Sequence, residues 1–361
     1  MLLREGKEHR TTRRAALPSF TTAALADYVN SLNLIIQKNI QLLPIGTKFS
    51  FYRFIQNTLF DVAAKIFVGL EPGTEKANNL NRLFAIVNAY FSVGDKMHLG
   101  LVFPGLRKLP FTIAGKAHSA RQKLRELFVE EIKVRRGSKQ EDMFSKYCNA
   151  TDEEGNYLSD HEIEGHMVFL LFAAFDTTTS AITNMLFYLS KHEGWQHKIR
   201  EEISSSVTEG ASFGEVSMMK NAELVFKETL RLWPSLMVMF RRTTREVTIA
   251  GYDIPANTRL MLSPPFTHRM SDWWEEPFSF DPMRFTEDRA EHERTEYMYI
   301  PFGGGGHRCV GRMFALLNSR LYLNNILKQF RIKTDADYQP RFQHFHLPRP
   351  EDGLIMKLEK L

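Results

Sequence analysis

The chain has 361 residues, with 47 Lys and Arg against 42 Asp and Glu, so its formal net charge is +5 at pH 7. Hydrophobic residues make up 43% and charged residues 25%, which is typical of a globular protein and excludes disordered, collagen-like and coiled-coil classes. Basic residues are interleaved with acids along the chain, and we therefore expect no nucleic-acid partner.

The two cysteines, Cys148 and Cys309, are too few for a disulfide framework and favour a reducing compartment. The longest apolar run, residues 167–175, is much shorter than the roughly 20 residues that cross a bilayer. No apolar leader follows the initiator methionine. For the chain as given we expect a cytoplasmic protein, with an anchor lost from the N-terminus as the open alternative.

Helical periodicity dominates the first two thirds of the chain. It predicts helices over residues 23–41, 51–68, 79–91 and 115–136, after a basic segment at residues 8–18. Ser159 and Glu162 form a capping-box pattern, from which a long helix can run to about His192. A further helix reaches Leu232 and is stopped by Pro234.

Beyond residue 241 the pattern changes to short strands and loops. Residues 247–255 predict strands around a Gly turn, and residues 270–291 predict an irregular packed meander. A glycine loop at 303–306 precedes a final helix at 311–330, and residues 348–350 followed by residues 354–358 predict a terminal hairpin. Because no repeat or linker interrupts the chain, we expect one domain over residues 1–361, mainly α with a minor β portion.

The motif with the clearest chemistry is the segment from Pro301 to Arg312. A phosphate-binding loop is disfavoured because the Gly-Lys-Ser/Thr end of a P-loop is missing, while a structural cysteine in a turn remains an alternative. Cys309 directly precedes the predicted helix, whose N-terminal dipole and free N–H groups stabilise a thiolate. The glycines allow a large flat ligand to approach the backbone. Such a thiolate is a suitable axial ligand for haem iron.

Phe302, Gly305, His307, Cys309 and Gly311 stand in the register of a Phe-x-x-Gly-x-His/Arg-x-Cys-x-Gly loop. In this segment the sequence resembles the cytochrome P-450 family of haem-thiolate monooxygenases. The resemblance implies the P-450 fold and a haem b cofactor (iron protoporphyrin IX), with Cys309 as the iron ligand. The resemblance begins at about residue 6, and family members carry further helices and strands before the corresponding position. We therefore expect an N-terminally truncated fold, whether as a fragment or as a natural short form.

A second motif joins two distant segments. Glu228 and Arg231 lie at positions i and i+3 of a predicted helix, where the plain interpretation is a solvated ion pair. Together with Arg284 in a Pro-Met-Arg-Phe segment, they are similar to the buried Glu-Arg-Arg triad of the family. The resemblance implies a structural role, in which the triad holds the meander below the cysteine loop.

A third motif lies in the middle of the long helix. Residues 176–180 read Asp-Thr-Thr-Thr-Ser, which are poor choices for a helix interior because their side chains compete for backbone groups. An exposed polar turn is the plain interpretation, but the preceding apolar run favours burial. The segment resembles the family's acid–alcohol signature, which implies catalytic roles for Asp176 as the acid and Thr177 as the alcohol. Ala174 stands where the family usually has Gly.

The basic segment near the N-terminus supplies candidate cofactor contacts. His9 and Arg13 are four residues apart and share a helix face, which a solvated basic helix would also explain. The resemblance implies that His9, Arg13, Arg241 and His307 hold the haem propionates through charge-assisted hydrogen bonds. It also places Phe302 of the cysteine loop against the cofactor.

The resemblance implies a monooxygenase that inserts one atom of O2 into a C–H bond of a lipophilic small molecule. The chain shows no flavin or nicotinamide fingerprint, so a separate ferredoxin or flavoprotein reductase is expected to supply electrons. Two alternatives remain: a haem-thiolate isomerase, lyase or peroxygenase, and a non-catalytic haem-binding remnant. The acid–alcohol pair argues against the first of these.

Overall fold

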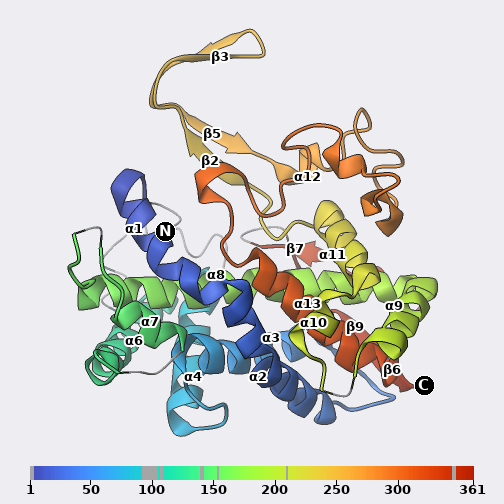
Figure 1. Ribbon diagram of the computed structural model, residues 1–361, viewed down its shortest axis with the longest axis horizontal. Coiled ribbons are helices and arrows are strands. Elements are labelled where there is room, and N and C mark those ends of the chain that lie inside the picture. Colours follow the sequence, from blue (N-terminus) through green and yellow to red (C-terminus); the bar gives the residue numbers. More distant parts are fainter. Residues whose placement is uncertain are drawn as a thin grey trace.

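The computed structural model describes residues 4–91, 105, 109–138, 142–152, 154–208, 210–343 and 347–361. Helices form most of this structure and short strands a minor part, which confirms the predicted fold class (Figure 1). The helices are α1 (Gly6–Ala16), α2 (Thr22–Gln41), α3 (Phe51–Val62), α4 (Glu75–Phe91), α6 (Ile113–Arg135), α7 (Met143–Cys148), α8 (Asp160–Lys191), α9 (Glu193–Ser206), α10 (Phe213–Ser217), α11 (Lys220–Leu232), α12 (Pro264–Thr267) and α13 (Arg312–Leu327).

The strands form small antiparallel groups at the periphery of the helices. They are β1 (Lys48–Ser50), β2 (Met239–Arg242), β3 (Val247–Ile249), β4 (Tyr252–Ile254), β5 (Arg259–Leu262), β6 (Phe330–Lys333), β7 (Phe342–Gln343), β8 (Arg349–Pro350) and β9 (Ile355–Lys360). The sheet orders are β1-β9-β6, β2-β5, β3-β4 and β7-β8. The β3–β4 hairpin projects away from the body at the top of Figure 1.

The long helix α8 crosses the middle of the molecule and packs against α3, α6 and α11 (Figure 1). It begins at the predicted capping box, in which the Ser159 hydroxyl accepts from the Glu162 N–H and the Glu162 carboxylate accepts from the Ser159 N–H. Helical structure continues without a break through the polar turn at 176–180. By length and hydropathy α8 could cross a membrane, but 61% of its most apolar window is buried inside the protein. That burial is typical of the central helix of a globular core.

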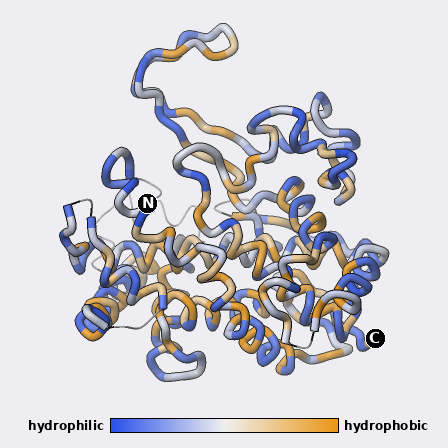
Figure 2. The backbone as a smooth tube through the Cα atoms, viewed as in Figure 1, coloured by the Kyte–Doolittle hydropathy of each residue, from blue (hydrophilic) through white to orange (hydrophobic). Residues whose placement is uncertain are grey.

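The hydrophobic core lies between the helices. Buried side chains of α2, α3, α4, α6, α8, α11 and α13 form one continuous cluster, and the hydrophobic colouring of Figure 2 follows these helices. A second, smaller cluster of Trp274, Phe285 and Met298 lies within the irregular segment after α12. This segment therefore has its own apolar centre, apart from the main core.

Several predicted elements differ in detail from the structure. The helix expected over 51–68 ends as an α-helix at Val62 and continues as a π-helical turn, η2 (Ala63–Phe67). Helix α4 begins four residues before the predicted start, because the Thr74 hydroxyl caps it by accepting from the Ala77 N–H (3.3 Å). The terminal hairpin expected between residues 348–350 and 354–358 was wrong, because β8 pairs with β7 whereas β9 pairs with β1 and β6.

Candidate functional site

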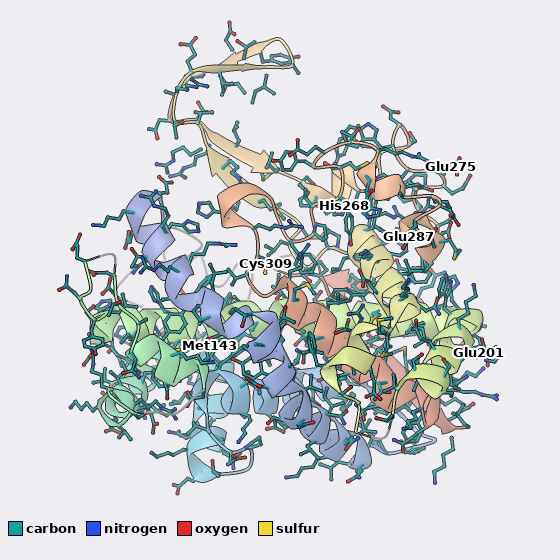
Figure 3. The ribbon with its side chains drawn as sticks, in the orientation of Figure 1. Met143, Glu201, His268, Glu275, Glu287 and Cys309 are labelled. Atoms are coloured by element: carbon teal, nitrogen blue, oxygen red, sulfur yellow. The ribbon has the colours of Figure 1, made fainter. Side chains whose placement is uncertain are left out.

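The cysteine loop is shaped by a backbone hydrogen bond and by two glycines, Gly304 and Gly305, at which a side chain would be strained or crowded. Cys309 follows a short helical turn, η6 (Gly305–His307), and its N–H donates to the Phe302 carbonyl (2.9 Å). Gly305 has a φ of +64°, which favours glycine. A Cβ on Gly304 would lie 2.8 Å from a ring carbon of Tyr297, closer than van der Waals contact allows. The loop therefore holds Cys309 in one place, immediately before α13 (Figure 3).

The Cys309 thiol experiences opposing electrostatic effects. The residue is exposed, yet the atoms packed around its sulfur displace water and raise the pKa of the thiol above its usual value. A hydrogen bond from the Gly311 N–H and the positive charges of Arg13 and Arg312 act in the opposite direction. These groups lower the pKa because they stabilise the thiolate. The loop thus presents an accessible sulfur with donors and cations nearby.

Helix α1 brings two of the predicted cofactor contacts beside this loop. The rings of His9 and His307 stack with centroids 3.8 Å apart. Arg13 donates from Nη1 to the Arg308 carbonyl (2.6 Å), which ties α1 to the residue before Cys309. His9 is buried, and its Nε2 atom has no hydrogen-bond partner within the described part of the chain. Desolvation, followed by the charges of His307 and Arg13, lowers the pKa of His9.

The two other predicted contacts are positioned differently. Arg241 lies on β2 with an exposed side chain, and its Nη1 donates to the Phe240 carbonyl (2.9 Å). Among the contacts of the described residues, none joins Arg241 to His9, Arg13 or His307. Phe302 is partly buried, and its ring lies 6.5 Å from that of Phe226 on α11. Its carbonyl, which accepts from Cys309, contributes to the loop directly.

These residues fit a haem. One accessible thiol is available as an axial ligand, and a glycine-rich backbone surrounds it. The unpartnered Nε2 of His9, the adjacent His307 and the Arg13 guanidinium supply hydrogen-bond donors and positive charge of the kind that bind carboxylates. A bound iron porphyrin would need both features, because its iron takes a protein ligand and its two propionates need hydrogen-bond donors or cations.

The acid and the alcohol of the polar turn in α8 occupy different environments. Asp176 is buried, and its Oδ1 accepts a hydrogen bond from Asn88 Nδ2 on α4 (3.0 Å). Burial raises the pKa of Asp176 to about 6, against the opposing effects of Asn88 and Arg349. Thr177 donates from Oγ1 to the Ala173 carbonyl (2.7 Å), so its oxygen can still accept a hydrogen bond.

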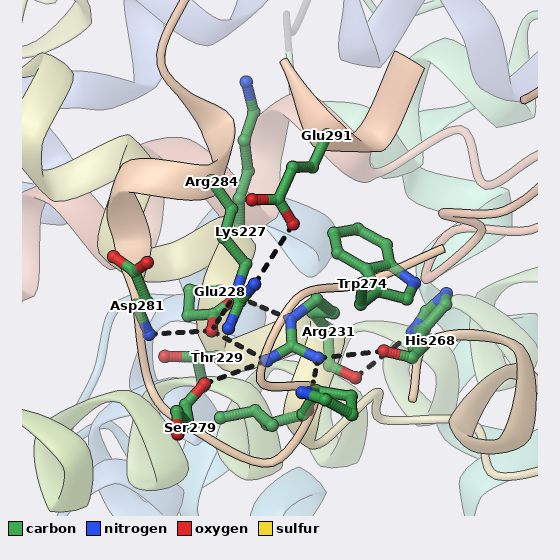
Figure 4. A network of polar contacts seen from close by, with 12 residues as sticks. Lys227, Glu228, Thr229, Arg231, His268, Trp274, Ser279, Asp281, Arg284 and Glu291 are labelled. Carbon is green, nitrogen blue, oxygen red and sulfur yellow. Dashed lines mark hydrogen bonds and ion pairs between the residues drawn. The ribbon is translucent and has the colours of Figure 1, made fainter. Parts of the chain in front are cut away.

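The structure brings Glu228, Arg231 and Arg284 together with almost no exposure of their side chains (Figure 4). Arg231 binds Glu228 in a bidentate manner, at 2.7 Å from Nε to Oε2 and 2.8 Å from Nη2 to Oε1. Arg284 Nε lies 3.4 Å from Glu228 Oε1, which also accepts from the Asp281 N–H (2.8 Å). The carboxylate of α11 thus binds two cations and the backbone of the meander.

Arg231 also holds the meander through main-chain atoms. Its Nη1 donates to the carbonyls of His268 (2.9 Å) and Pro277 (2.7 Å), and its Nη2 donates to the Ser279 carbonyl (3.1 Å). The guanidinium also lies 5.1 Å from the centre of the Trp274 ring, in the second apolar cluster. One side chain of α11 therefore fixes three points of a segment that has little regular structure.

Three polar residues of these sites were not anticipated from the sequence. Glu291, fully buried, accepts from Arg284 Nη1 (3.1 Å) and pairs with Arg289. His268 is also fully buried, and its Nε2 accepts from the Ile300 N–H (2.9 Å); burial lowers its pKa to about 3. Asn88 binds Asp176 from an otherwise ordinary amphipathic helix. Each is an isolated polar residue without a motif, so only the folded structure shows its partner.

Comparisons with known proteins agree with this geometry. The family model described as cytochrome P-450 matches residues 1–358. A Mycobacterium tuberculosis protein named as a cytochrome P-450 136 is 31% identical over 361 residues, covering 99% of this chain and 72% of the relative. Taxane 13-alpha-hydroxylase of Taxus cuspidata is 28% identical over 373 residues, covering 98% of this chain and 73% of the relative.

Among solved structures, the retinoic acid-bound cyanobacterial CYP120A1 superposes with a TM-score of 0.87 at 26% identity. The match covers 99% of this chain and 80% of that chain. Human lanosterol 14-alpha demethylase is 30% identical over 299 residues, covering 81% of this chain and 57% of the relative. The likeness in sequence and in structure thus extends over almost the whole chain.

Proposed function

The chain belongs to the cytochrome P-450 family of haem-dependent monooxygenases, and we propose that it inserts one atom of O2 into a C–H bond of a large lipophilic molecule. The observation that carries the proposal is the accessible thiol of the cysteine loop beside the His9, His307 and Arg13 group. Bound haem b would supply the iron at which O2 is activated.

In this proposal Cys309 holds the iron through its thiolate. The Gly311 N–H and the cations Arg13 and Arg312 stabilise the negative charge on sulfur. His9, His307 and Arg13 bind the propionates, since they form the donor group beside the loop. Phe302 and Arg241 are further proposed contacts, one in the loop and one on the neighbouring strand β2.

Asp176 and Thr177 are proposed to deliver protons to the distal side of the site. A carboxyl with a pKa of about 6 exists in both protonation states near neutral pH, which suits a group that both gives and regains protons. The Thr177 oxygen can accept a hydrogen bond from a donor in the site while its own O–H donates to the Ala173 carbonyl. Proton delivery favours oxygen insertion over the release of peroxide.

The proposed role of Glu228, Arg231 and Arg284 is structural. Together they bind the meander to α11, and the meander leads into the cysteine loop. Their burial and distance from solvent support a role in holding the loop rather than in chemistry.

For the substrate, we propose a bulky lipophile. Relatives are named for action on taxanes and lanosterol, and the solved neighbour contains retinoic acid. The chain itself is rich in Phe, with 28 residues. For electron supply we propose a separate acidic partner, either a ferredoxin or a flavoprotein, because Arg308 and Arg312 are exposed on either side of Cys309. A cytoplasmic location is part of the same proposal.

Two measurements test the proposal. The reduced protein with carbon monoxide should show the Soret band of a thiolate-bound haem. Turnover with a ferredoxin, its reductase and isotopically heavy O2 should then add one heavy oxygen atom to a bulky lipophile such as retinoic acid or lanosterol. A band typical of a neutral axial ligand would contradict the role of Cys309. A product whose new oxygen comes from water would contradict oxygen insertion from O2.

A further inference from the structure

Asn88 is a buried amide that contacts the proposed catalytic acid from a different helix. It lies in the last turn of α4 with 6% of its surface exposed, and its Nδ2 donates to Asp176 Oδ1 (3.0 Å). Among the described residues, Asn88 is the one that forms a hydrogen bond with the Asp176 side chain. The other carboxylate oxygen, Oδ2, is therefore left to exchange protons.

A cluster of three aromatic rings packs α4 and α8 together, with α3 beside them, next to the contact between Asn88 and Asp176. The rings of Phe60 on α3 and Phe175 on α8 stack with centroids 3.9 Å apart. Phe84 on α4 meets both rings edge-on, at 5.8 Å from Phe60 and 5.6 Å from Phe175. Phe84 is one helical turn before Asn88, and Phe175 is the neighbour of Asp176. Because the cluster aligns both backbones, the amide and the carboxyl meet in a defined orientation.

The charges around Asp176 come from several elements. Burial raises the pKa of Asp176, whereas the hydrogen bond from Asn88 and the positive charge of Arg349 on β8 lower it. Tyr52 at the start of α3 is the other titratable neighbour; burial and the charge of Asp176 raise its pKa to about 12, so it stays neutral. Asn88 is the contact that acts on Asp176 by direct hydrogen bonding, and it outweighs Arg349.

We propose that Asn88 is a positioning residue of the oxygenation reaction: through its amide, α4 holds the Asp176 carboxyl in the orientation from which it passes protons towards Thr177. The inference rests on the proposed role of Asp176 in proton delivery. In each cycle the carboxyl releases one proton from Oδ2 to water in the site and takes one back from solvent, so that Asp176 is unchanged overall. Asn88 neither gains nor loses a proton.

The geometry predicts what happens when the amide is removed. A donor to the carboxylate favours its charged form, and hydrogen bonds of this kind are worth about one unit of pKa. Asn88→Ala and Asn88→Leu should therefore both raise the pKa of Asp176 by about one unit. Leu has the same number and branching of side-chain heavy atoms as Asn, so a role in filling space alone would be disturbed more by Ala than by Leu. Asn81→Ala, two turns earlier on α4, is the matched control.

The first readout is independent of turnover. Infrared spectroscopy of the holoprotein follows a carboxyl stretching band as pH is raised. The band of Asp176 is identified as the one that disappears in Asp176→Asn. Its midpoint should move upward by about one pH unit in both Asn88 variants and stay unchanged in Asn81→Ala. An unmoved midpoint in Asn88→Leu would overturn the role of Asn88.

The second readout uses reduced nicotinamide, a ferredoxin and its reductase, with no substrate added. The peroxide released per O2 consumed is measured against pH, because efficient proton delivery diverts O2 to water. The pH at which the ratio of peroxide to O2 changes should be higher by about one unit in both Asn88 variants, with unchanged haem content. If Asp176→Asn leaves the ratio and its profile unaltered, the role of Asp176 fails and the inference fails with it. If Asp176→Asn alters them and the Asn88 variants do not, the inference alone fails.

Discussion

Glu228 offers the sharpest test of how the meander is held. Glu228→Gln keeps the shape of the side chain and an oxygen that can accept from the Asp281 N–H, but it removes the negative charge. Arg231, with 0% of its side chain exposed, would then be a buried cation without an anion within the described part of the chain, while Arg284, with 1% exposed, would keep only Glu291. Breaking a buried ion pair by removing one partner costs about 3–5 kcal/mol.

That cost translates into a measurable shift. A chain of 361 residues unfolds with an entropy of about 0.76 kcal/mol/K, so a loss of about 3–5 kcal/mol lowers the unfolding temperature by about 4–7 °C. Thermal unfolding of the holoprotein, followed by tryptophan fluorescence, gives the value. Trp274 is well placed as a reporter because its ring contacts the Arg231 guanidinium.

Glu223→Gln is the matched control on the same helix. Glu223 also has two cationic partners, Lys227 (2.8 Å) and Arg320 (2.6 Å), but 29% of its side chain is exposed. Solvent reaches the Glu223 carboxylate, although only 7% of the Arg320 side chain is exposed, so the expected loss is about 1 kcal/mol and the shift in unfolding temperature about 1 °C. If Glu228→Gln lowers the unfolding temperature no more than Glu223→Gln does, the buried cations are not held by this carboxylate and the reasoning is refuted.

Three further predictions concern the site itself. Cys309→Ser should abolish the thiolate band in the carbon monoxide spectrum, whereas Cys148→Ser, at a fully buried position, should keep it; the opposite result would reassign the ligand. Thr177→Ala should slow proton delivery by roughly 10²–10⁴-fold and raise the peroxide released per O2, with haem content unchanged. Thr179→Ala removes a hydroxyl that also bonds back to its helix and should leave the ratio unaltered; equal effects would contradict the assignment. Asp176→Asn should stabilise the protein by about 3 kcal/mol at pH 7 and by nothing at pH 4. Burial holds the pKa of Asp176 at about 6, so the unmodified protein loses stability as pH rises from about 4 to about 6, whereas the Asp176→Asn variant does not. A difference in unfolding free energy between the two proteins that is the same at pH 4 and pH 7 would rule this out.

Sequence patterns located those parts of the site that depend on local spacing. The register of Phe302, Cys309 and Gly311 marked the loop, and the capping box at Ser159 marked the start of α8. Glu228 and Arg231 share one helix face, but their spacing alone predicts a solvated pair, and only the resemblance to the family motif implied a buried triad. Each of these signals lies within about ten residues and depends on backbone geometry that the neighbours impose.

Contacts between distant elements could not be predicted in the same way. Asn88 meets Asp176 only because three aromatic rings set the spacing of α3, α4 and α8. His268 and Glu291 belong to a segment without periodicity, so nothing in their neighbourhood indicates burial. The polar turn of α8 is also instructive, because hydroxyls that compete for backbone carbonyls do not interrupt the helix. Thr177 and Thr179 donate to carbonyls one turn earlier, Ser180 donates to the Pro348 carbonyl, and helical structure continues.

Arg231 has a consequence for how freely this protein can change. The three acceptors that fix the meander are backbone carbonyls, which every amino acid possesses, Pro277 included. The interaction therefore depends on the backbone conformation of the meander and not on most of its side chains. Phe278, with 76% of its surface exposed, lies between two of these anchored points without being needed by them. Mutations can accumulate on the outer surface of the meander while the cysteine loop below keeps its position, provided that one arginine is retained.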